Sequence, residues 1–426
     1  MPLIEPTITP STTAVAGGPC RSCGENLRDV FVDLGMSPLC ESFLAADQLN
    51  RMEPFYPLCV FTCRRCGLAQ LQQYVDPSEI FTEYAYFSSY STAWLAHAQA
   101  YTETMRERLG LGRDHLVVEL ASNDGYLLQY FVAAGIAVLG VEPALNVAAA
   151  AVDKGVPTLT EFFDATVARR LVAEGKAADL IVANNVLAQV PDLNAFVAGM
   201  RVLLKPRGVI TVEFPHLMRL IDGNQFDTIY HEHFSYFSFL AAERIFAAHG
   251  LRVFDVEELW THGGSLRLFL RHAADGSRPP SGAVAALRAR EQAAGYANPP
   301  GGPYASFEQR VRATKRNLLE FLIDAKRMGK SVVGYGAPGK GNTLLNYCGI
   351  GTDFLDFTVD RNPYKHGRFL PGTHIPIHPP GQIEATRPDY ILILPWNLQE
   401  EIMTQLAHAR DWGARFVVPI PELVVR

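Results

Sequence analysis

Short apolar runs alternate with amphipathic stretches along most of the chain, and this alternation predicts an α/β fold. Residues 116–143 give a strand, a tight turn, a helix and a second strand, which together make a βαβ unit. Residues 178–214 continue with a strand, a loop, a helix, a turn and another strand. The alternation starts again at Lys330 and runs almost to the end of the chain. We therefore expect two Rossmann-like α/β domains, one central and one C-terminal.

Composition and charge narrow the class of partner. Charged residues make up 19% of the chain and the net charge is -6, which argues against a surface that neutralises many phosphates. The chain has no run of about 18 apolar residues and its first residues do not read as a signal peptide. We expect a cytoplasmic enzyme that binds neither nucleic acid nor membrane.

The cysteines are unevenly spaced, with six of the seven between Cys20 and Cys66. Two CxxCG units in this segment each turn two sulfurs toward one point, and four thiolates would close a structural zinc site with no position for water. Cys40 and Cys59 are left over, although Cys59 lies close enough to compete as a ligand. Two buried cysteine pairs or a redox CxxC are the alternatives. The expected zinc ligands are Cys20, Cys23, Cys63 and Cys66.

The turn of the central βαβ unit indicates the cofactor. The first strand ends at Glu119, and the turn that follows, Ser122-Asn123-Asp124-Gly125, carries a single glycine instead of GxGxxG. Pyrophosphate needs several close backbone approaches, whereas the sulfonium cofactor has no phosphate, so the turn favours S-adenosylmethionine over NAD. Glu142 ends the second strand, 17 residues past Gly125, where doubly wound folds place a carboxylate for ribose hydroxyls.

The order of elements after this unit resembles that of class I methyltransferases. Asn184 and Asn185 end the next strand and are expected to meet the methionine part of the cofactor or the substrate. The acid and the asparagines could instead cap helices. The expected cofactor-binding residues are Glu119, Ser122, Asn123, Asp124, Gly125, Glu142, Asn184 and Asn185.

Residues 226–238 are unusually dense in titratable and aromatic side chains. Tyr230, His231, Glu232 and His233 could supply a base, a partner that orients it, and a phenol that stabilises an oxyanion. The spacing excludes the HExxH and HxxEH zinc motifs. A metal held by the two histidines, or a polar aromatic loop packed on the next domain, are the alternatives.

In the C-terminal domain a glycine-rich turn follows the first strand. Gly334, Gly336 and Gly339 allow close backbone approach, and Lys340 adds positive charge for a diphosphate. Asp360, at the end of the next strand, could meet a ribose. A packing domain with a tight turn is the alternative. Further substrate-binding candidates here are Asn342, Arg361 and Lys365.

These motifs occur together in one family. The two CxxC units, SNDG with VEP, YxEH at Tyr230, His262-Gly-Gly-Ser265 and the glycine–lysine loop resemble the sugar C-methyltransferase family of deoxysugar pathways. The resemblance implies a zinc module, a central domain that binds S-adenosylmethionine, and a nucleotide sugar, with thymidine diphosphate as carrier, against the C-terminal domain. It also implies His233 as a base with Tyr230 and Glu232 beside it, a further tyrosine at Tyr84, and His262 near the substrate.

The expected reaction is methylation of the carbon next to the ketone of a nucleotide 4-keto-6-deoxysugar, since a base must remove that proton and the enolate oxygen needs donors. Whether the carbon is C-3 or C-5 is left open. Gln189 departs from relatives, which often carry a histidine there, so the sugar could differ. A methyltransferase acting on oxygen or nitrogen, or a zinc-ribbon protein that modifies or binds RNA, are the alternatives.

The chain, at 426 residues, exceeds the size of a single hydrophobic core, so several domains are expected. A stretch rich in Gly, Pro and Ala predicts a linker, and the Pro-, Ser- and Thr-rich start predicts a disordered tail. We expect a monomer or homodimer. The expected divisions are a tail at 1–17, a zinc-binding domain at 18–85, a methyltransferase domain at 86–275, a linker at 276–304 and a Rossmann-like domain at 305–426.

Overall fold

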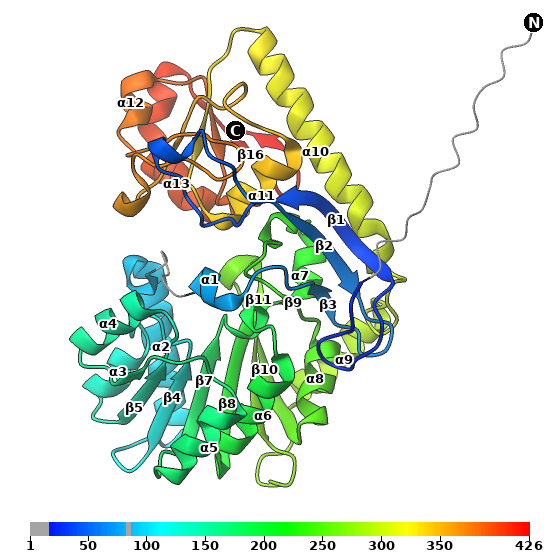
Figure 1. The fold of residues 1–426 in the computed structure, drawn as a ribbon, viewed down its shortest axis with the longest axis vertical. Helices are drawn as coiled ribbons and strands as arrows, with labels where there is room; N and C mark the ends of the chain where they lie inside the picture. Colours follow the sequence, from blue (N-terminus) through cyan, green and yellow to red (C-terminus); the bar gives the residue numbers. More distant parts are fainter. Residues whose placement is uncertain (1–16, 82–86) are drawn as a thin grey trace, which may run out of the picture.

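The computed structural model describes residues 17–81 and 87–426. They form a four-stranded, a seven-stranded and a six-stranded sheet, and the two larger sheets carry helices (Figure 1). The predicted α/β fold class with two α/β domains is confirmed. Tyr84 and all of the expected tail except Gly17 lie outside the described residues. Within the described part of the chain, no helix is long and apolar enough to cross a membrane.

The N-terminal module is an antiparallel sheet in the order β1-β2-β3-β9. Its last strand comes from the middle of the sequence, directly after the Tyr230–His233 segment, so that segment is joined to the module through backbone hydrogen bonds. The following short helix is α1 (Pro77–Phe81). The strands are β1 (Asp29–Ser37), β2 (Tyr56–Thr62), β3 (Ala69–Leu71) and β9 (Ser235–Tyr236).

The central sheet has the order β10-β11-β8-β7-β4-β5-β6. Strands β4 to β8 are parallel, and β11 runs antiparallel to its neighbours β8 and β10. The inner strands are buried on both faces, as their continuous apolar runs require. The strands are β4 (Leu116–Leu120), β5 (Ala137–Val141), β6 (Thr158–Leu159), β7 (Ala178–Asn184), β8 (Leu204–Pro215), β10 (Leu251–Leu259) and β11 (Ser265–His272). The helices are α2 (Thr92–Leu109), α3 (Leu128–Ala133), α4 (Leu145–Asp153), α5 (Ala165–Ala173), α6 (Leu193–Leu203), α7 (Leu217–Asp222) and α8 (Phe239–Ala248).

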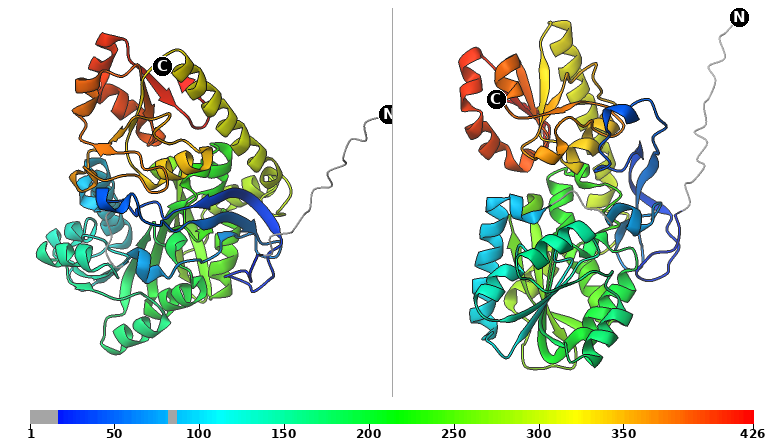
Figure 2. Two further views of the ribbon diagram at one scale, coloured as in Figure 1. Left: turned by 45° about the horizontal axis from the view of Figure 1, so that its top comes forward. Right: turned by 60° about the vertical axis from the view of Figure 1, so that its left-hand side comes forward.

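The C-terminal sheet has the order β14-β13-β12-β15-β16-β17 and is parallel except for its last strand. Figure 2 shows this domain above the central one, with the N-terminal module along one side of both. The strands are β12 (Val332–Tyr335), β13 (Thr358–Val359), β14 (Ile377–His378), β15 (Tyr390–Ile393), β16 (Arg415–Val418) and β17 (Val424–Val425). The helices are α10 (Pro303–Arg327), α11 (Gly339–Cys348), α12 (Gln382–Thr386) and α13 (Gln399–Gln405).

Part of the segment expected to be a linker forms helix α9 (Gly282–Ala293). Its Gly and Pro residues gather at the two ends, and the alanine-rich middle favours a helix. Glu291 of this helix is fully buried and accepts hydrogen bonds from the backbone N–H groups of Phe239 (2.7 Å) and Leu240 (2.9 Å) at the start of α8. His216 Nε2 lies 2.6 Å from the same carboxylate. The helix is therefore packed on the central domain.

Candidate active site

A large cavity of about 730 Å³ lies where the three modules meet, at the carboxyl ends of the central parallel strands. In doubly wound folds this edge is where ligands bind. The predicted residues that line it are Asn123, Glu142, Asn184, Asn185, Gln189, Tyr230, Glu232, His233, His262, Lys340, Asp360, Arg361 and Lys365. The described residues that line the cavity do not include five of the predicted site residues, namely Glu119, Ser122, Asp124, Gly125 and Asn342.

Glu142 is held rigidly on the cofactor side of the cavity. Its two carboxylate oxygens accept hydrogen bonds of 2.9 Å from the backbone N–H groups of Asn123 and Ala144. Burial raises the pKa of this carboxyl, although the two N–H groups favour its charged form. A fixed acceptor at this position suits the hydroxyl groups of a ribose.

The loop after β4 is held in place by contacts with neighbouring segments. Asp124 Oδ2 lies 3.0 Å from Lys154 Nζ, and the Asn123 side chain accepts a hydrogen bond of 3.0 Å from the backbone N–H of Ser88. Gly125 has a φ of 74°, and a Cβ there would lie 3.0 Å from Val156. The sequence predicts the approach of a ligand at this glycine, whereas its close neighbours in the structure belong to α4 and to the loop that follows α4.

The two asparagines after β7 fit a polar ligand. Asn185 has a φ of 55°, and its backbone N–H donates to the carbonyl of Glu213 at 2.7 Å. Asn184 Oδ1 and both side-chain polar atoms of Asn185 are buried without a hydrogen-bond partner among residues 17–81 and 87–426. Such atoms each cost about 1–3 kcal/mol. A bound amino acid or ribose group would supply the missing partners, which is the fit expected for S-adenosylmethionine.

The four predicted zinc ligands lie together. The sulfurs of Cys20, Cys23, Cys63 and Cys66 are all within 4.8 Å of one another, and the Cys20–Cys66 and Cys23–Cys63 pairs are 3.5 Å apart. Four sulfurs about 2.3 Å from a zinc ion would be separated by about 3.8 Å, so the cluster fits a closed, structural site. Cys59 is not in the cluster.

The Tyr230–His233 segment divides into side chains that line the cavity and one that does not. Tyr230, Glu232 and His233 line the cavity. His231 instead lies with Nε2 3.2 Å from the carbonyl oxygen of Pro57, so it joins the segment to the N-terminal module. The sequence offered all four residues as candidates, and the structure brings three of them to the cavity.

His233 is held in one tautomer. Its Nδ1 lies 3.1 Å from the carbonyl oxygen of Thr228, and because a carbonyl can only accept, Nδ1 carries the proton and Nε2 carries a lone pair. Burial lowers the pKa of His233 to about 4, so the ring is neutral at pH 7. The Tyr230 ring centroid lies 4.2 Å from that of His233. Burial raises the pKa of Tyr230, which keeps its hydroxyl protonated.

Lysine and arginine side chains line the C-terminal side of the cavity at Lys340, Arg361 and Lys365. Lys340 Nζ donates to Asn397 Oδ1 at 2.8 Å and lies 4.6 Å from the centroid of the Trp396 ring. Burial lowers the pKa of Lys340. Arg361 lies 3.1 Å from Glu401 and Lys365 lies 3.6 Å from Glu41, and both of these carboxylates also line the cavity. The three cations are nevertheless candidates to bind an anionic group of the ligand.

Asp360 has a structural role that the sequence did not show. Its two carboxylate oxygens accept hydrogen bonds from the backbone N–H groups of Ala337 (2.7 Å) and Asn362 (2.8 Å). The side chain therefore ties together the loops after β12 and β13 while still lining the cavity.

The glycines of the C-terminal loop are needed for packing within the protein. A Cβ at Gly336, whose φ is 90°, would lie 2.6 Å from Pro395 Cδ, and one at Gly339 would lie 2.9 Å from the sulfur of Cys40. Both glycines also line the cavity, so the close approach of a diphosphate that the sequence predicts here stays a prediction.

Three consecutive parts of the chain match family models described as "Putative zinc binding domain" (residues 20–81), "Methyltransferase domain" (94–256) and "C-methyltransferase C-terminal domain" (260–421). C-methyltransferase NovU of Streptomyces niveus is 39% identical over 405 residues, which is 95% of each chain. The chain belongs to the C-methyltransferase family. It is accordingly an S-adenosylmethionine-dependent C-methyltransferase with a zinc-binding domain, as the sequence predicted.

Two similar solved structures each match part of this C-methyltransferase. Magnesium protoporphyrin IX methyltransferase of Synechocystis is 15% identical and the match covers 42% of this chain and 80% of that one, with a TM-score of 0.32. An S-adenosylmethionine-dependent methyltransferase of Aquifex aeolicus is 14% identical over 39% of this chain and 87% of that one, with a TM-score of 0.30. Likenesses this weak carry no argument here.

Several cavity residues of this C-methyltransferase escaped the sequence reasoning. Cys40 and Glu41 reach the cavity from the loop between β1 and β2, and Trp94 reaches it from α2. No local pattern singles these residues out. Glu161 to Asp164 also line the cavity, and their place after the carboxyl end of β6 was a signal that could have found them.

Proposed function

We propose that this C-methyltransferase methylates the carbon next to the ketone of a nucleotide 4-keto-6-deoxysugar, with thymidine diphosphate as the carrier. The observation that carries the proposal is the pair His233 and Tyr230 in one cavity, with a basic nitrogen and a protonated phenol side by side. A carbon next to a ketone becomes a nucleophile only after its proton is removed.

His233 is the base in this proposal. Its Nε2 lone pair is available at pH 7, because the low pKa keeps the ring neutral and the bond to Thr228 fixes the proton on Nδ1. The imidazolium that forms is disfavoured by burial, and the negative charge that develops on the substrate enolate offsets that cost. Glu232 lines the cavity next to it and would orient the base or hold a sugar hydroxyl.

Tyr230 is the donor for the enolate oxygen. Its raised pKa means that the hydroxyl keeps its proton and can donate a hydrogen bond to the oxygen as charge develops. Tyr84, which the family resemblance adds as a second tyrosine, lies outside the described residues and stays a prediction.

S-adenosylmethionine supplies an electrophilic methyl group when it is bound. Glu142 would accept the hydrogen bonds of its ribose, and Asn123, Asn184 and Asn185 would hold the rest of the molecule at the carboxyl edge of the sheet. The carbon of the sugar must approach the methyl group in line with its bond to sulfur, so the cofactor and the sugar need fixed positions. The residues assigned to the cofactor and those assigned to the sugar line the same cavity, which would hold the two molecules in this arrangement.

The carrier is assigned to the C-terminal side of the cavity. Lys340, Arg361 and Lys365 would bind the diphosphate, and Asp360 a ribose hydroxyl. Gln189 and His262 would contact the sugar. Because Gln189 cannot act as a base, the sugar's substituents need not match those used by relatives with histidine there.

The test is incubation of the purified protein with nucleotide 4-keto-6-deoxysugars and cofactor carrying a ¹³C methyl group. The proposal expects a mass gain of one methyl and a new ¹³C signal coupled to the carbon next to the ketone, at C-3 or C-5. Methylation of an oxygen or nitrogen, or no transfer to any sugar of the panel, would contradict it. Parallel reactions with the corresponding 4-hydroxy sugars, which lack an acidic C–H, are the control.

A further inference from the structure

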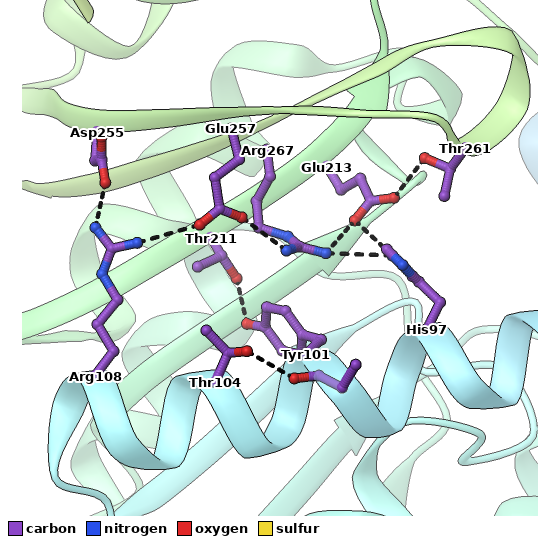
Figure 3. Close-up of polar contacts among 11 residues, drawn as sticks. His97, Tyr101, Thr104, Arg108, Thr211, Glu213, Asp255, Glu257, Thr261 and Arg267 are labelled. Carbon is purple, nitrogen blue, oxygen red and sulfur yellow. Dashed lines mark hydrogen bonds and ion pairs between the residues drawn. The ribbon is translucent and has the colours of Figure 1, made fainter. Parts of the chain in front are cut away.

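A buried carboxylate lies behind the cavity, at the carboxyl end of β8. Glu213 pairs in the sheet with Asn184 of the cavity edge, and its side chain is fully buried. Arg267 Nη2 of β11 donates to it at 2.8 Å and Thr261 Oγ1 at 2.9 Å, while His97 Nε2 of α2 lies 3.2 Å away (Figure 3). One carboxylate therefore joins three separate elements.

Glu213 is not one of the described residues that line the cavity. Burial acts to raise the pKa of its carboxyl, but the bonds from His97, Arg267 and Thr261 outweigh burial and hold that pKa below its usual range. The Glu213 side chain is thus a buried carboxylate that stays charged, and each of its two oxygens has a polar partner.

The residues that Glu213 holds carry two side chains of the cavity surface. Thr261 precedes His262, and His97 lies one helical turn from Trp94. The His262 and Trp94 ring centroids are 5.3 Å apart, and the Trp94 ring stacks on His97 at 5.0 Å. Glu213 therefore contacts Thr261 and His97, and these two residues are connected to each other through the rings of His262 and Trp94. We call the two cavity-facing side chains the Trp94–His262 surface.

The loop that carries His262 needs such support. His262 has φ 52° and ψ 27°, a left-handed conformation that is uncommon for residues other than glycine. Ser265 Oγ donates to the carbonyl of Thr261 at 2.9 Å, and Gln225 Nε2 donates to that of Gly263 at 2.8 Å. The bond from Thr261 to Glu213, which also contacts His97, links this loop to α2 in addition to the contact between the His262 and Trp94 rings.

We propose that Glu213 is a positioning residue, which through Thr261 and His97 fixes the Trp94–His262 surface in the orientation that receives the substrate. The inference rests on the proposed function only in taking this cavity as the place of methyl transfer. Glu213 acts from behind the surface and touches neither substrate nor cofactor. The surface is accordingly formed before the substrate arrives, which lowers the cost of ordering it on binding.

Thr261→Val and Thr261→Ser form the matched pair that tests this. Valine keeps the shape and removes the hydroxyl, whereas serine keeps the donor, and neither change disturbs a charge. We expect Thr261→Val to raise the KM for the ketosugar about tenfold and to leave the affinity for S-adenosylhomocysteine within about twofold, while Thr261→Ser stays close to wild type. A purely structural defect would lower the melting temperature without separating sugar from cofactor.

Glu213→Gln tests the carboxylate directly, with Glu257→Gln as its control. Glu257 accepts a hydrogen bond from the same Arg267 at 3.0 Å, and no contact drawn in Figure 3 joins it to Thr261 or His97. We expect Glu213→Gln to reproduce the Thr261→Val kinetics and Glu257→Gln to leave them unchanged. If Glu213→Gln does not fold, the threonine pair still decides the question.

Hydrogen–deuterium exchange of the loop at 260–266 gives a readout that needs no substrate. In the wild-type structure the Gly264 N–H donates to the Thr261 carbonyl at 2.9 Å, and this bond protects the amide from exchange. We expect faster exchange in Thr261→Val than in Thr261→Ser or wild type, because the loop loses the bond that holds Thr261 in place. Faster exchange without turnover of any ketosugar would support the positioning role and contradict the proposed substrate. Equal exchange and equal KM values in the threonine pair would overturn the positioning role.

Discussion

The thiol of Cys40 donates a hydrogen bond to Oε1 of Glu232 over 3.5 Å, although 192 residues separate them in the sequence. Burial raises the pKa of Cys40, and the nearby charge of Glu232 adds to this, so the sulfur keeps its proton and stays a donor. The N-terminal module thus contributes to the active cavity as well as binding zinc.

Replacement of Cys40 should lower activity in proportion to the loss of this donor. We expect Cys40→Ala to reduce kcat about three- to tenfold because Glu232 is held less firmly, and Cys40→Ser to keep most of the activity because its hydroxyl still donates. Initial rates with labelled cofactor measure this. Equal rates for the two variants would show that the thiol acts only through its volume.

Much of the site could be predicted because its signals are local. The CxxCG units, the turn at Ser122–Gly125 and the Tyr230–His233 segment each occupy a few consecutive residues with a known chemical use. Cys40, Trp94 and Glu213 could not be predicted, because their roles depend on contacts between distant segments. The packing of the glycine-rich turns could not be predicted for a related reason, since a sequence shows that a backbone must pass something closely but does not show what.

The stability of the protein should fall on mild acidification. The pKa of His233 is lowered from 6.5 to about 4 in the fold, so between these values the unfolded chain binds a proton that the folded chain excludes. Stability therefore decreases as the pH falls through that window. Urea unfolding at pH 7 and pH 5 should show a smaller difference for His233→Gln than for wild type. An equal difference would place the acid sensitivity elsewhere, as at His262, whose pKa burial also lowers to about 4.

Loss of one cysteine of the cluster should remove the metal. We expect Cys63→Ser to lose zinc and to melt at a lower temperature, because structural zinc contributes several kcal/mol to folding. Cys59→Ala, at a buried cysteine outside the cluster, should retain about one zinc per chain. The zinc content of each variant is measured by mass spectrometry. Loss of zinc in Cys59→Ala, with zinc retained in Cys63→Ser, would show that Cys59 is a ligand in place of Cys63.

Glu142 should govern affinity for the cofactor. Its removal takes away a fixed acceptor and frees the N–H groups of Asn123 and Ala144, so we expect Glu142→Ala to weaken binding of S-adenosylhomocysteine at least about tenfold. Calorimetric titration measures this. Unchanged affinity would remove Glu142 from the cofactor site.

The central claim is that His233 removes a proton from the carbon next to a ketone. The most direct measurement is deuterium uptake at that carbon when the ketosugar nucleotide is incubated in D₂O with enzyme and S-adenosylhomocysteine, which cannot donate a methyl group. We predict uptake with wild type and with His231→Gln, whose side chain faces Pro57, and none above the enzyme-free rate with His233→Gln. Wild-type uptake by His233→Gln would contradict the assignment of the base.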